Sequence, residues 1–260
     1  MDRIEFAKRI VERAGEITLK YFYEPAEYSV GRKADESPVT AADLAVEEFL
    51  RGRILELFPD DEILGEEFAS QTGTSGFKWL IDPIDGTKSF IHGVPLYSIL
   101  VGLEYDGVGI CGVVSFPALG EMLWAGKRMG AWHKTKRSQL PQKAKVSECR
   151  NIKDATFLTS EVSTYDKIGR RGAYERLERR VRLTRTWGDA YGYFLVATGR
   201  AEIMVDPILS DWDAAPMLVI LEEAGGNFTD WKANRTIYNK EGIATNGLLH
   251  EEVLQILGKE

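Results

Sequence analysis

The chain has 260 residues, of which 44% are hydrophobic and 28% charged, and its formal net charge is -7. This composition is typical of a soluble globular protein, excludes disordered and collagen-like chains, and allows one large domain or two closely joined ones. The acidic total disfavours nonspecific binding to nucleic acid or to an anionic membrane, so we expect neither as a partner.

The cysteines and histidines are too few for a disulfide scaffold or a structural zinc cluster, and together they suggest a reducing compartment. The first residues are charged and lack the apolar run of a signal peptide. The longest nearly uncharged stretch, residues 89–103, is too short to span a bilayer and is interrupted by glycine and proline. We therefore expect a cytoplasmic protein without a transmembrane segment.

Two amphipathic helices are predicted at the start of the chain. Apolar residues recur at helical spacing over residues 3–24, and Pro25 ends this helix. A second periodic run follows Thr40 and closes at Pro59. This register places Asp43 in the first turn of the second helix.

The middle of the chain has a different pattern. Apolar and β-branched residues form short runs that are separated by glycine, proline or an Asp-Gly pair, which is typical of strands joined by turns. We expect neighbouring, largely antiparallel strands. The runs cover residues 79–81, 97–105, 109–116 and 122–125.

A polar, lysine-rich segment at 134–150 is the best candidate for a boundary, and it divides the chain into halves 1–145 and 146–260. Helices and strands alternate after it, which indicates an α/β layer. The predicted strands are 156–160, 183–186, 201–206 and 242–245, and the predicted helices are 170–181, 188–198, 213–224 and 249–257.

A hydrophobic strand in the first half ends abruptly in two carboxylates three residues apart, Asp82 and Asp85. Asp-Pro and Asp-Gly are also ordinary turn formers, so this run alone leaves a simple acidic turn as an equal alternative. Other acids favour a site, because Glu66 and Glu67 follow another apolar run and Asp213 leads into an apolar helix.

If these acids converge, each raises the free energy of ionising the others, and a bound cation makes the cluster tolerable. Oxygen ligands without nearby cysteine or paired histidine favour Mg²⁺ over zinc. An EF-hand is excluded, because a loop that starts at Asp82 has Gly93 where the last ligand, a glutamate, is required.

Small and hydroxyl residues directly after Asp85 offer backbone N–H groups to an anion: Gly86, Thr87, Lys88 and Ser89. Carboxylates, metal and an anion nest together indicate metal-assisted hydrolysis of a phosphomonoester, which requires no protein nucleophile. An aspartyl-phosphate mechanism fits poorly, because Pro83 stands where its DxDGT run has the nucleophile. The chain has neither a GxxxxGK[ST] phosphate loop nor a GxSxG elbow.

Three segments, in this order and spacing, resemble the signatures of the inositol monophosphatase family: Gly65-Glu66-Glu67, Asp82-Pro-Ile-Asp85-Gly-Thr87 and Trp212-Asp213-Ala214-Ala215. The resemblance covers nearly the whole chain. It implies an α/β (α+β) fold, a five-layered αβαβα sandwich, with two or three Mg²⁺ ions per site and lithium sensitivity. It also implies a small phosphorylated metabolite as substrate and a homodimer.

Carried over residue by residue, the resemblance implies three groups of site residues. The metal ligands are Glu66, Asp82, the carbonyl of Ile84, Asp85 and Asp213, with Glu67 at a second, weaker metal. The catalytic residues are Asp43 and Thr87, which orient the attacking water, together with Glu66. The phosphate contacts are Asp85, Gly86, Thr87, Lys88 and Asp213.

Within the family, the segments 85–95 and 185–193 look most like the histidinol-phosphate phosphatase branch, whereas the inositol branch usually has Asn in place of Ser89. This implies hydrolysis of L-histidinol phosphate to L-histidinol and phosphate, in histidine biosynthesis. Extra acids would complement its ammonium and imidazole groups, and Asp189 and Asp206 are the candidates. Arg185 is a further candidate contact.

Competing interpretations remain open at this point. Asp189 is alternatively only a helix N-cap, and Trp187 and Tyr191 are either stacking partners of an imidazole or parts of the core. The substrate is alternatively inositol monophosphate or another small sugar phosphate. A noncatalytic regulatory or RNA-binding protein with the same fold is the competitor from another class.

Three features are interpreted as structural. The arginine-rich segment 170–185 is interrupted by glutamates and is explained by a helix face with ion pairs or by a subunit contact. His92 is a lone loop histidine, interpreted as hydrogen-bonded rather than catalytic. Cys111 is interpreted as a buried small hydrophobe.

Overall fold

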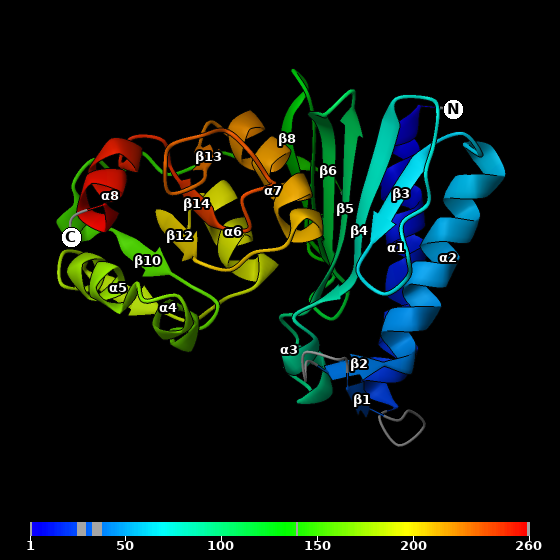
Figure 1. The fold of residues 1–260 in the computed structure, drawn as a ribbon, viewed down its shortest axis with the longest axis horizontal. Helices are drawn as coiled ribbons and strands as arrows, with labels where there is room; N and C mark the ends of the chain where they lie inside the picture. Colours follow the sequence, from blue (N-terminus) through cyan, green and yellow to red (C-terminus); the bar gives the residue numbers. More distant parts are fainter. Residues whose placement is uncertain (1, 25–29, 33–37, 139, 259–260) are drawn as a thin grey trace.

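The computed structural model describes residues 2–24, 30–32, 38–138 and 140–258, and these residues form five stacked layers (Figure 1). Two long helices cover one face of a seven-stranded sheet, and two further helices cover its other face. A five-stranded sheet and an outer helical layer follow. The expected αβαβα sandwich is therefore confirmed.

The first layer contains α1 (Arg3–Tyr23) and α2 (Ala41–Leu57), which agree with the two predicted helices. Pro25, predicted to end the first helix, lies outside the described residues. Between the helices, β1 (Val30–Arg32) and β2 (Pro38–Thr40) form a two-stranded antiparallel sheet. The apolar stripes of α1 and α2 pack on the large sheet through buried side chains such as Phe6, Val46 and Trp79.

The large sheet has its strands in chain order, and only its first pair is parallel. The four predicted strand runs are confirmed as antiparallel neighbours. The strands are β3 (Glu62–Gly65), β4 (Phe77–Asp85), β5 (Ser98–Tyr105), β6 (Val108–Phe116), β7 (Glu121–Gly126), β8 (Gly130–Lys134) and β9 (Gln142–Lys143), and the short helix α3 (Thr87–Ile91) follows β4.

The middle layer consists of α6 (Ala190–Ala197) and α7 (Asp211–Glu223), which are apolar on nearly all sides because both sheets pack against them. The backbone of α7 comes very close to the large sheet at two glycines. A Cβ at Gly112 would lie 2.2 Å from the carbonyl oxygen of Pro216, and a Cβ at Gly102 would lie 2.6 Å from the Cβ of Ala215. These glycines therefore set the position of α7.

The second sheet has the order β11-β10-β12-β14-β13. Its strands are β10 (Thr156–Leu158), β11 (Leu183–Arg185), β12 (Ile203–Asp206), β13 (Asn227–Thr229) and β14 (Gly242–Thr245). β10 is parallel to β11 and β12, whereas β14 is antiparallel to both of its neighbours. The outer helices are α4 (Ser163–Lys167), α5 (Arg171–Glu178) and α8 (His250–Leu257). The predicted helix 170–181 therefore ends earlier than expected.

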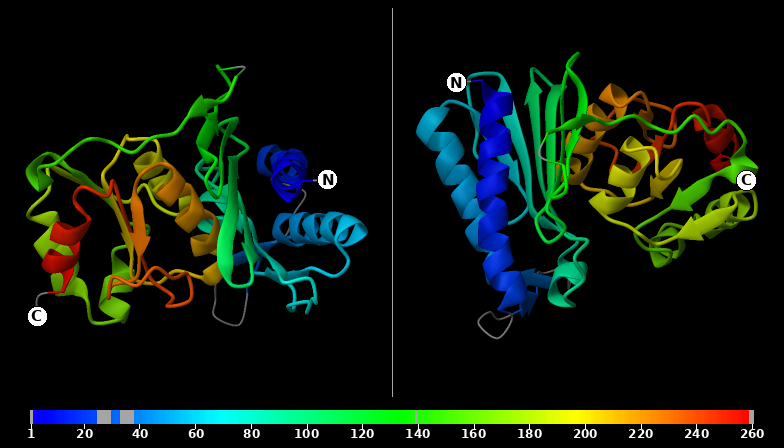
Figure 2. Two further views of the ribbon diagram at one scale, coloured as in Figure 1. Left: turned by 90° about the horizontal axis from the view of Figure 1, so that it is seen from above. Right: turned by 180° about the vertical axis from the view of Figure 1, so that it is seen from behind.

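The connection between the two sheets runs along the outside of the molecule (Figure 2). Residues 144–151 have no regular structure and lead to a 3-10 turn, Ile152–Asp154, before β10. The division at residue 145 stays a prediction. No helix within the described ranges is both long and apolar enough to cross a bilayer.

Candidate active site

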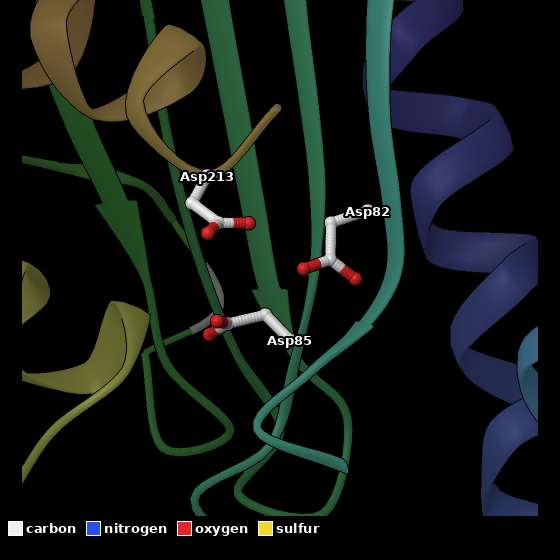
Figure 3. A group of neighbouring side chains, drawn as sticks. All are labelled: Asp82, Asp85 and Asp213. Atoms are coloured by element: carbon white, nitrogen blue, oxygen red, sulfur yellow. The ribbon is translucent and has the colours of Figure 1, made fainter. Parts of the chain in front are cut away.

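A β-bulge at the end of β4 brings two aspartates together. Along a regular strand, residues three positions apart point to opposite faces. Here Asp82 pairs with Leu100 and Asp85 with Ser98, so three steps along β4 match two steps along β5. The extra residue lies at the turn that contains Pro83, a residue that sheets tolerate at bulges. Both carboxylates consequently point toward the start of α7 (Figure 3).

The third carboxylate of this group comes from the first turn of α7. Asp213 Oδ2 accepts a hydrogen bond from the backbone N of Ser210 at 3.1 Å and closes a capping box. Asp43 has the same place in α2, where its Oδ2 accepts from the backbone N of Thr40 at 2.8 Å and from the Thr40 hydroxyl at 2.5 Å. Asp43 therefore lies in the predicted first turn, where the helix dipole favours negative charge.

Asp82, Asp85 and Asp213 form a compact group, with potential ligand atoms within 4.8 Å of one another (Figure 3). Burial, followed by repulsion from Glu66, raises the pKa of Asp82 well above its usual range, and burial raises the pKa of Asp213 to about 7. The charge of each carboxylate thus disfavours ionisation of its neighbours. Clustered oxygen donors of this kind fit a hard divalent cation, which removes the repulsion.

Glu66 lies outside this group of three but close to it. It lines the same cavity as Gly86 and Thr87. Its charge raises the pKa values of Asp82 and Asp43, for which burial is the larger cause. The structure therefore brings Glu66 to the edge of the carboxylate group.

A residue that sequence reasoning missed, Glu47 of α2, holds the loop after β3. Its side chain is fully buried and accepts hydrogen bonds from the backbone N of Glu67 at 2.7 Å and of Phe68 at 3.2 Å. It forms an ion pair with Arg51 at 2.7 Å. Gly65 makes room for it, because a Cβ there would lie 2.0 Å from Glu47 Oε1. The sequence contained one signal for this role, because Glu47 lies among the apolar residues of the buried face of α2, where a charged side chain needs a partner.

The turn after Asp85 contains the residues predicted to form an anion nest. Gly86 has φ 79°, a left-handed conformation that favours glycine, and α3 starts directly after it. The Thr87 hydroxyl donates to the Ile84 carbonyl at 3.1 Å. A cavity of about 530 Å³ covers this turn. Its lining includes Glu66, Gly86, Thr87, Lys88 and Ser89 from the first half of the chain and Ser160, Glu161 and Asp189 from the second.

Asp85 lines a second, smaller cavity of about 100 Å³. Asp206 and Asp213 line it together with Asp189 and Ser160. Asp189 and Ser160 thus line both cavities, so they lie between the predicted phosphate nest and the predicted substrate contacts.

Asp206 is buried and bonded on both oxygens. It accepts from the Ser160 backbone N at 2.8 Å, the Ser160 hydroxyl at 3.0 Å, the Tyr193 hydroxyl at 3.0 Å and the Thr159 hydroxyl at 3.3 Å. Burial raises the pKa of Asp206 to about 6. Ser160 carries no sequence motif, and we find no local signal that identifies it.

Asp189 precedes α6 but its side chain does not cap the helix. Its Oδ2 instead lies 2.8 Å from the point where a Cβ at Gly86 would sit. Burial raises the pKa of Asp189, while Lys88 lowers it. Asp189 therefore occupies the N-cap position of α6 without the side-chain hydrogen bond of an N-cap, and its role toward the substrate stays a prediction.

The remaining candidates lie further out. Lys88 pairs with Glu161 at 2.8 Å at the rim of the larger cavity. Arg185 is exposed, donates to the Thr184 carbonyl and lines neither of these two cavities. Trp187 is 43% exposed, whereas Tyr191 packs in an aromatic cluster against the core.

The features interpreted as structural have ordinary partners. His92 Nδ1 is 2.7 Å from the Lys88 carbonyl, and Cys111 is buried with no disulfide. In the arginine-rich segment, Arg176 donates to the last carbonyls of α8, and Arg179 pairs with Glu175. An ion pair and helix contacts thus account for these two arginines.

Fold and site together define a metal-dependent enzyme of the α+β sandwich class, with an acidic centre built from both halves of the chain. The model of the inositol monophosphatase family matches residues 2–260. The chain therefore belongs to the inositol monophosphatase family, and the resemblance drawn from its motifs is confirmed.

Similar proteins carry two kinds of name. A histidinol-phosphatase of Chlorobaculum parvum is 39% identical over 98% of this chain and 96% of its own length. A histidinol-phosphatase of Mycobacterium tuberculosis is 37% identical over 97% of this chain and 96% of its own. The solved IMPase of Thermotoga maritima is 30% identical, with a TM-score of 0.85 over 99% of this chain and 97% of that one.

Proposed function

We propose that this chain is a Mg²⁺-dependent phosphomonoesterase that hydrolyses L-histidinol phosphate to L-histidinol and phosphate in histidine biosynthesis. The observation that carries the hydrolase is the group of Asp82, Asp85 and Asp213 directly beside the nest at Gly86. Whole-length similarity to histidinol-phosphatases supports the choice of substrate.

The proposed metal ligands are the carboxylates of Glu66, Asp82, Asp85 and Asp213 and the carbonyl of Ile84, with Glu67 at a weaker site and two or three ions in all. When bound, Mg²⁺ polarises the phosphoryl oxygens and promotes the ionisation of water. The carboxylates hold the ions in a buried place, where their charge is little screened by solvent.

The backbone N–H groups of Gly86 and Thr87 bind and orient the phosphate in this proposal, and Lys88 adds positive charge at the rim. Asp43 and the Thr87 hydroxyl orient the attacking water. Thr40 fixes the Asp43 carboxylate through two hydrogen bonds, and burial raises its pKa, which suits a proton acceptor.

On the substrate side, Asp189 faces the nest and is the proposed partner of the ammonium group, which in histidinol phosphate lies on the carbon next to the ester CH₂. Asp206 and Arg185 are proposed as further contacts. Inositol monophosphate is the second candidate substrate, favoured by the structural similarity to an IMPase.

Phosphate release from a substrate panel tests the proposal. The panel contains histidinol phosphate, inositol 1-phosphate, fructose 1,6-bisphosphate and adenosine 3′,5′-bisphosphate, each with Mg²⁺ or EDTA, and Asp82→Asn serves as the inactive control. We expect Mg²⁺-dependent preference for histidinol phosphate. Equal turnover of inositol 1-phosphate would contradict the substrate, and no turnover of any ester would favour the noncatalytic alternative.

The homodimer and the cytoplasmic location are also proposed. Light scattering on an eluting size-exclusion peak tests the first, with twice the mass of the 29.2 kDa chain as the expected result.

A further inference from the structure

Asp189 has an unusual backbone conformation, with φ 52° and ψ −155°. This region of the map is occupied almost only by glycine, so an aspartate there is strained and must be held by its surroundings. The strained residue is also the one whose carboxylate lies against Gly86. Backbone conformation and carboxylate position are therefore linked.

Two hydrogen bonds hold the backbone around Asp189. Its own N–H donates to Ser160 Oγ at 2.8 Å, and the N–H of Ala190 donates to Asp85 Oδ2 at 2.8 Å. The residue is thus fixed on one side by the second sheet and on the other by the carboxylate group of the first.

Ser160 is itself held in one orientation. Its backbone N and its hydroxyl donate to the two oxygens of Asp206, at 2.8 and 3.0 Å. A hydroxyl has one proton, so donation to Asp206 leaves its lone pairs to accept from Asp189. The buried Asp206 therefore orients the Ser160 hydroxyl, which in turn accepts the hydrogen bond from the backbone N–H of Asp189.

The loop before Asp189 packs directly on Ser160. A Cβ at Gly188 would lie 2.1 Å from the Cα of Ser160, so no side chain fits between the two backbones. The contact thus depends on the close approach of Ser160 and Gly188, which are 28 positions apart in the chain.

We propose that Ser160 is a positioning residue that holds the Asp189 carboxylate beside the phosphate nest and thereby sets selectivity for phosphate esters with a cationic group near the ester oxygen. A fixed carboxylate there repels a phosphate dianion, and a substrate ammonium compensates for this repulsion. Neutral alcohols offer no such compensation. The choice of substrate rests on the proposed function, whereas the positioning role does not.

Kinetics with two esters test the selectivity. For Ser160→Ala we expect KM for histidinol phosphate to rise about tenfold, because one strong hydrogen bond is lost. We expect a much smaller change in kcat for this substrate and in KM for glycerol 2-phosphate, which has no cationic group. Ser160→Thr keeps the hydroxyl and should restore KM. Ser70→Ala removes an exposed serine hydroxyl that lines neither cavity and should behave as wild type.

A double variant tests whether Ser160 acts through Asp189. If it does, adding Ser160→Ala to Asp189→Asn raises KM for histidinol phosphate no further than Asp189→Asn alone. Multiplying losses would show an independent role and would overturn the proposal.

Crystal structures give a readout that does not depend on the substrate. In Ser160→Ala we expect residue 189 to leave the left-handed region, and in Ser160→Thr to keep it. If a folded Ser160→Ala variant keeps the φ angle and the carboxylate position of Asp189, the positioning role is overturned. This outcome does not depend on whether histidinol phosphate is the substrate. Should Ser160→Ala not fold, Ser160→Cys, of similar size with a weak hydrogen-bond group, takes its place.

Discussion

Individual carboxylates of the site have raised pKa values, because burial disfavours their charged form. Burial raises the pKa of Asp82 well above its usual range and the pKa of Asp213 to about 7. Ligand carboxylates must lose their protons to bind a cation, so cation binding and proton release are linked.

The thermal stability of the metal-free protein and its gain in stability from Mg²⁺ should therefore depend on pH in opposite directions. The folded-state pKa values of Asp82 and Asp213 lie above the unfolded value of about 3.9, so protonation stabilises the metal-free fold. This contribution is fully present below about pH 4 and is lost as the pH rises through about 7. With EDTA, we expect Tm to fall between about pH 5.5 and about pH 8, whereas the gain in Tm from Mg²⁺ grows over the same range.

Thermal unfolding followed by circular dichroism measures both trends. Asp213→Asn is the matched variant, since it removes one of the two titrating groups and should flatten the profile with EDTA. A Mg²⁺ gain in Tm that is independent of pH would contradict the linkage.

Among the elements, α2 positions more of the site than its sequence suggested. It carries Asp43 in its first turn and Glu47 one turn later, and Glu47 holds the loop that contains Glu66 and Glu67. The helix therefore fixes the carboxylate of Asp43, proposed to orient the attacking water, and the proposed metal ligands after β3 as one unit.

We expect Glu47→Gln to weaken Mg²⁺ binding and lower the free energy of unfolding by about 1–3 kcal/mol. Glutamine replaces one acceptor oxygen by a donor, which leaves a buried N–H of the loop or of Arg51 without its partner. Calorimetric titration with Mg²⁺ and denaturant unfolding measure the two effects. Glu48→Gln, on the exposed side of the same helix, is the control, and equal behaviour of the two variants would contradict this role.

Elements with long periodic patterns were predictable, whereas of the short ones some strands, such as β10, β11 and β14, were predicted and others were not. The helix over 3–24 and the strands β4 to β7 follow directly from apolar spacing. Sequence reasoning missed β3, β13, α3 and α4, each of five residues or fewer, because such lengths hold too few repeats to define a period.

The predictable part of the site was equally local. Asp82, Asp85 and Gly86 lie in one run whose turn chemistry is visible in sequence. Glu47 and Ser160 act across 20 and 29 positions, on Glu67 and Asp189, and only the folded chain brings these pairs together.

For the whole molecule, the two halves of the chain depend on each other. The face of the large sheet opposite α1 and α2 is buried mainly against α6 and α7, which belong to the second half. Leu80, Leu100, Val114 and Leu123 on this face are all fully buried. The carboxylate group is likewise shared, because Asp213 comes from the second half.

A fragment of residues 1–145 is therefore expected not to fold cooperatively, because its uncovered sheet face would expose a large apolar surface. Urea unfolding and dye binding to exposed apolar surface measure this. Coexpression with 146–260 is the control and should restore a folded, active complex. A cooperative transition in the isolated fragment would instead support two independently folding halves.

The capping boxes at Asp43 and Asp213 have a consequence for how this chain can evolve. The same carboxylates that the proposed chemistry requires also hold the first turns of α2 and α7. Each acid accepts from the backbone N–H of the N-cap residue, Thr40 or Ser210, which would otherwise lack this partner. In a lineage that abandons hydrolysis, folding alone therefore selects for an acceptor at these two positions, for which Asn serves as well as Asp, and only the proposed chemistry selects for the charge.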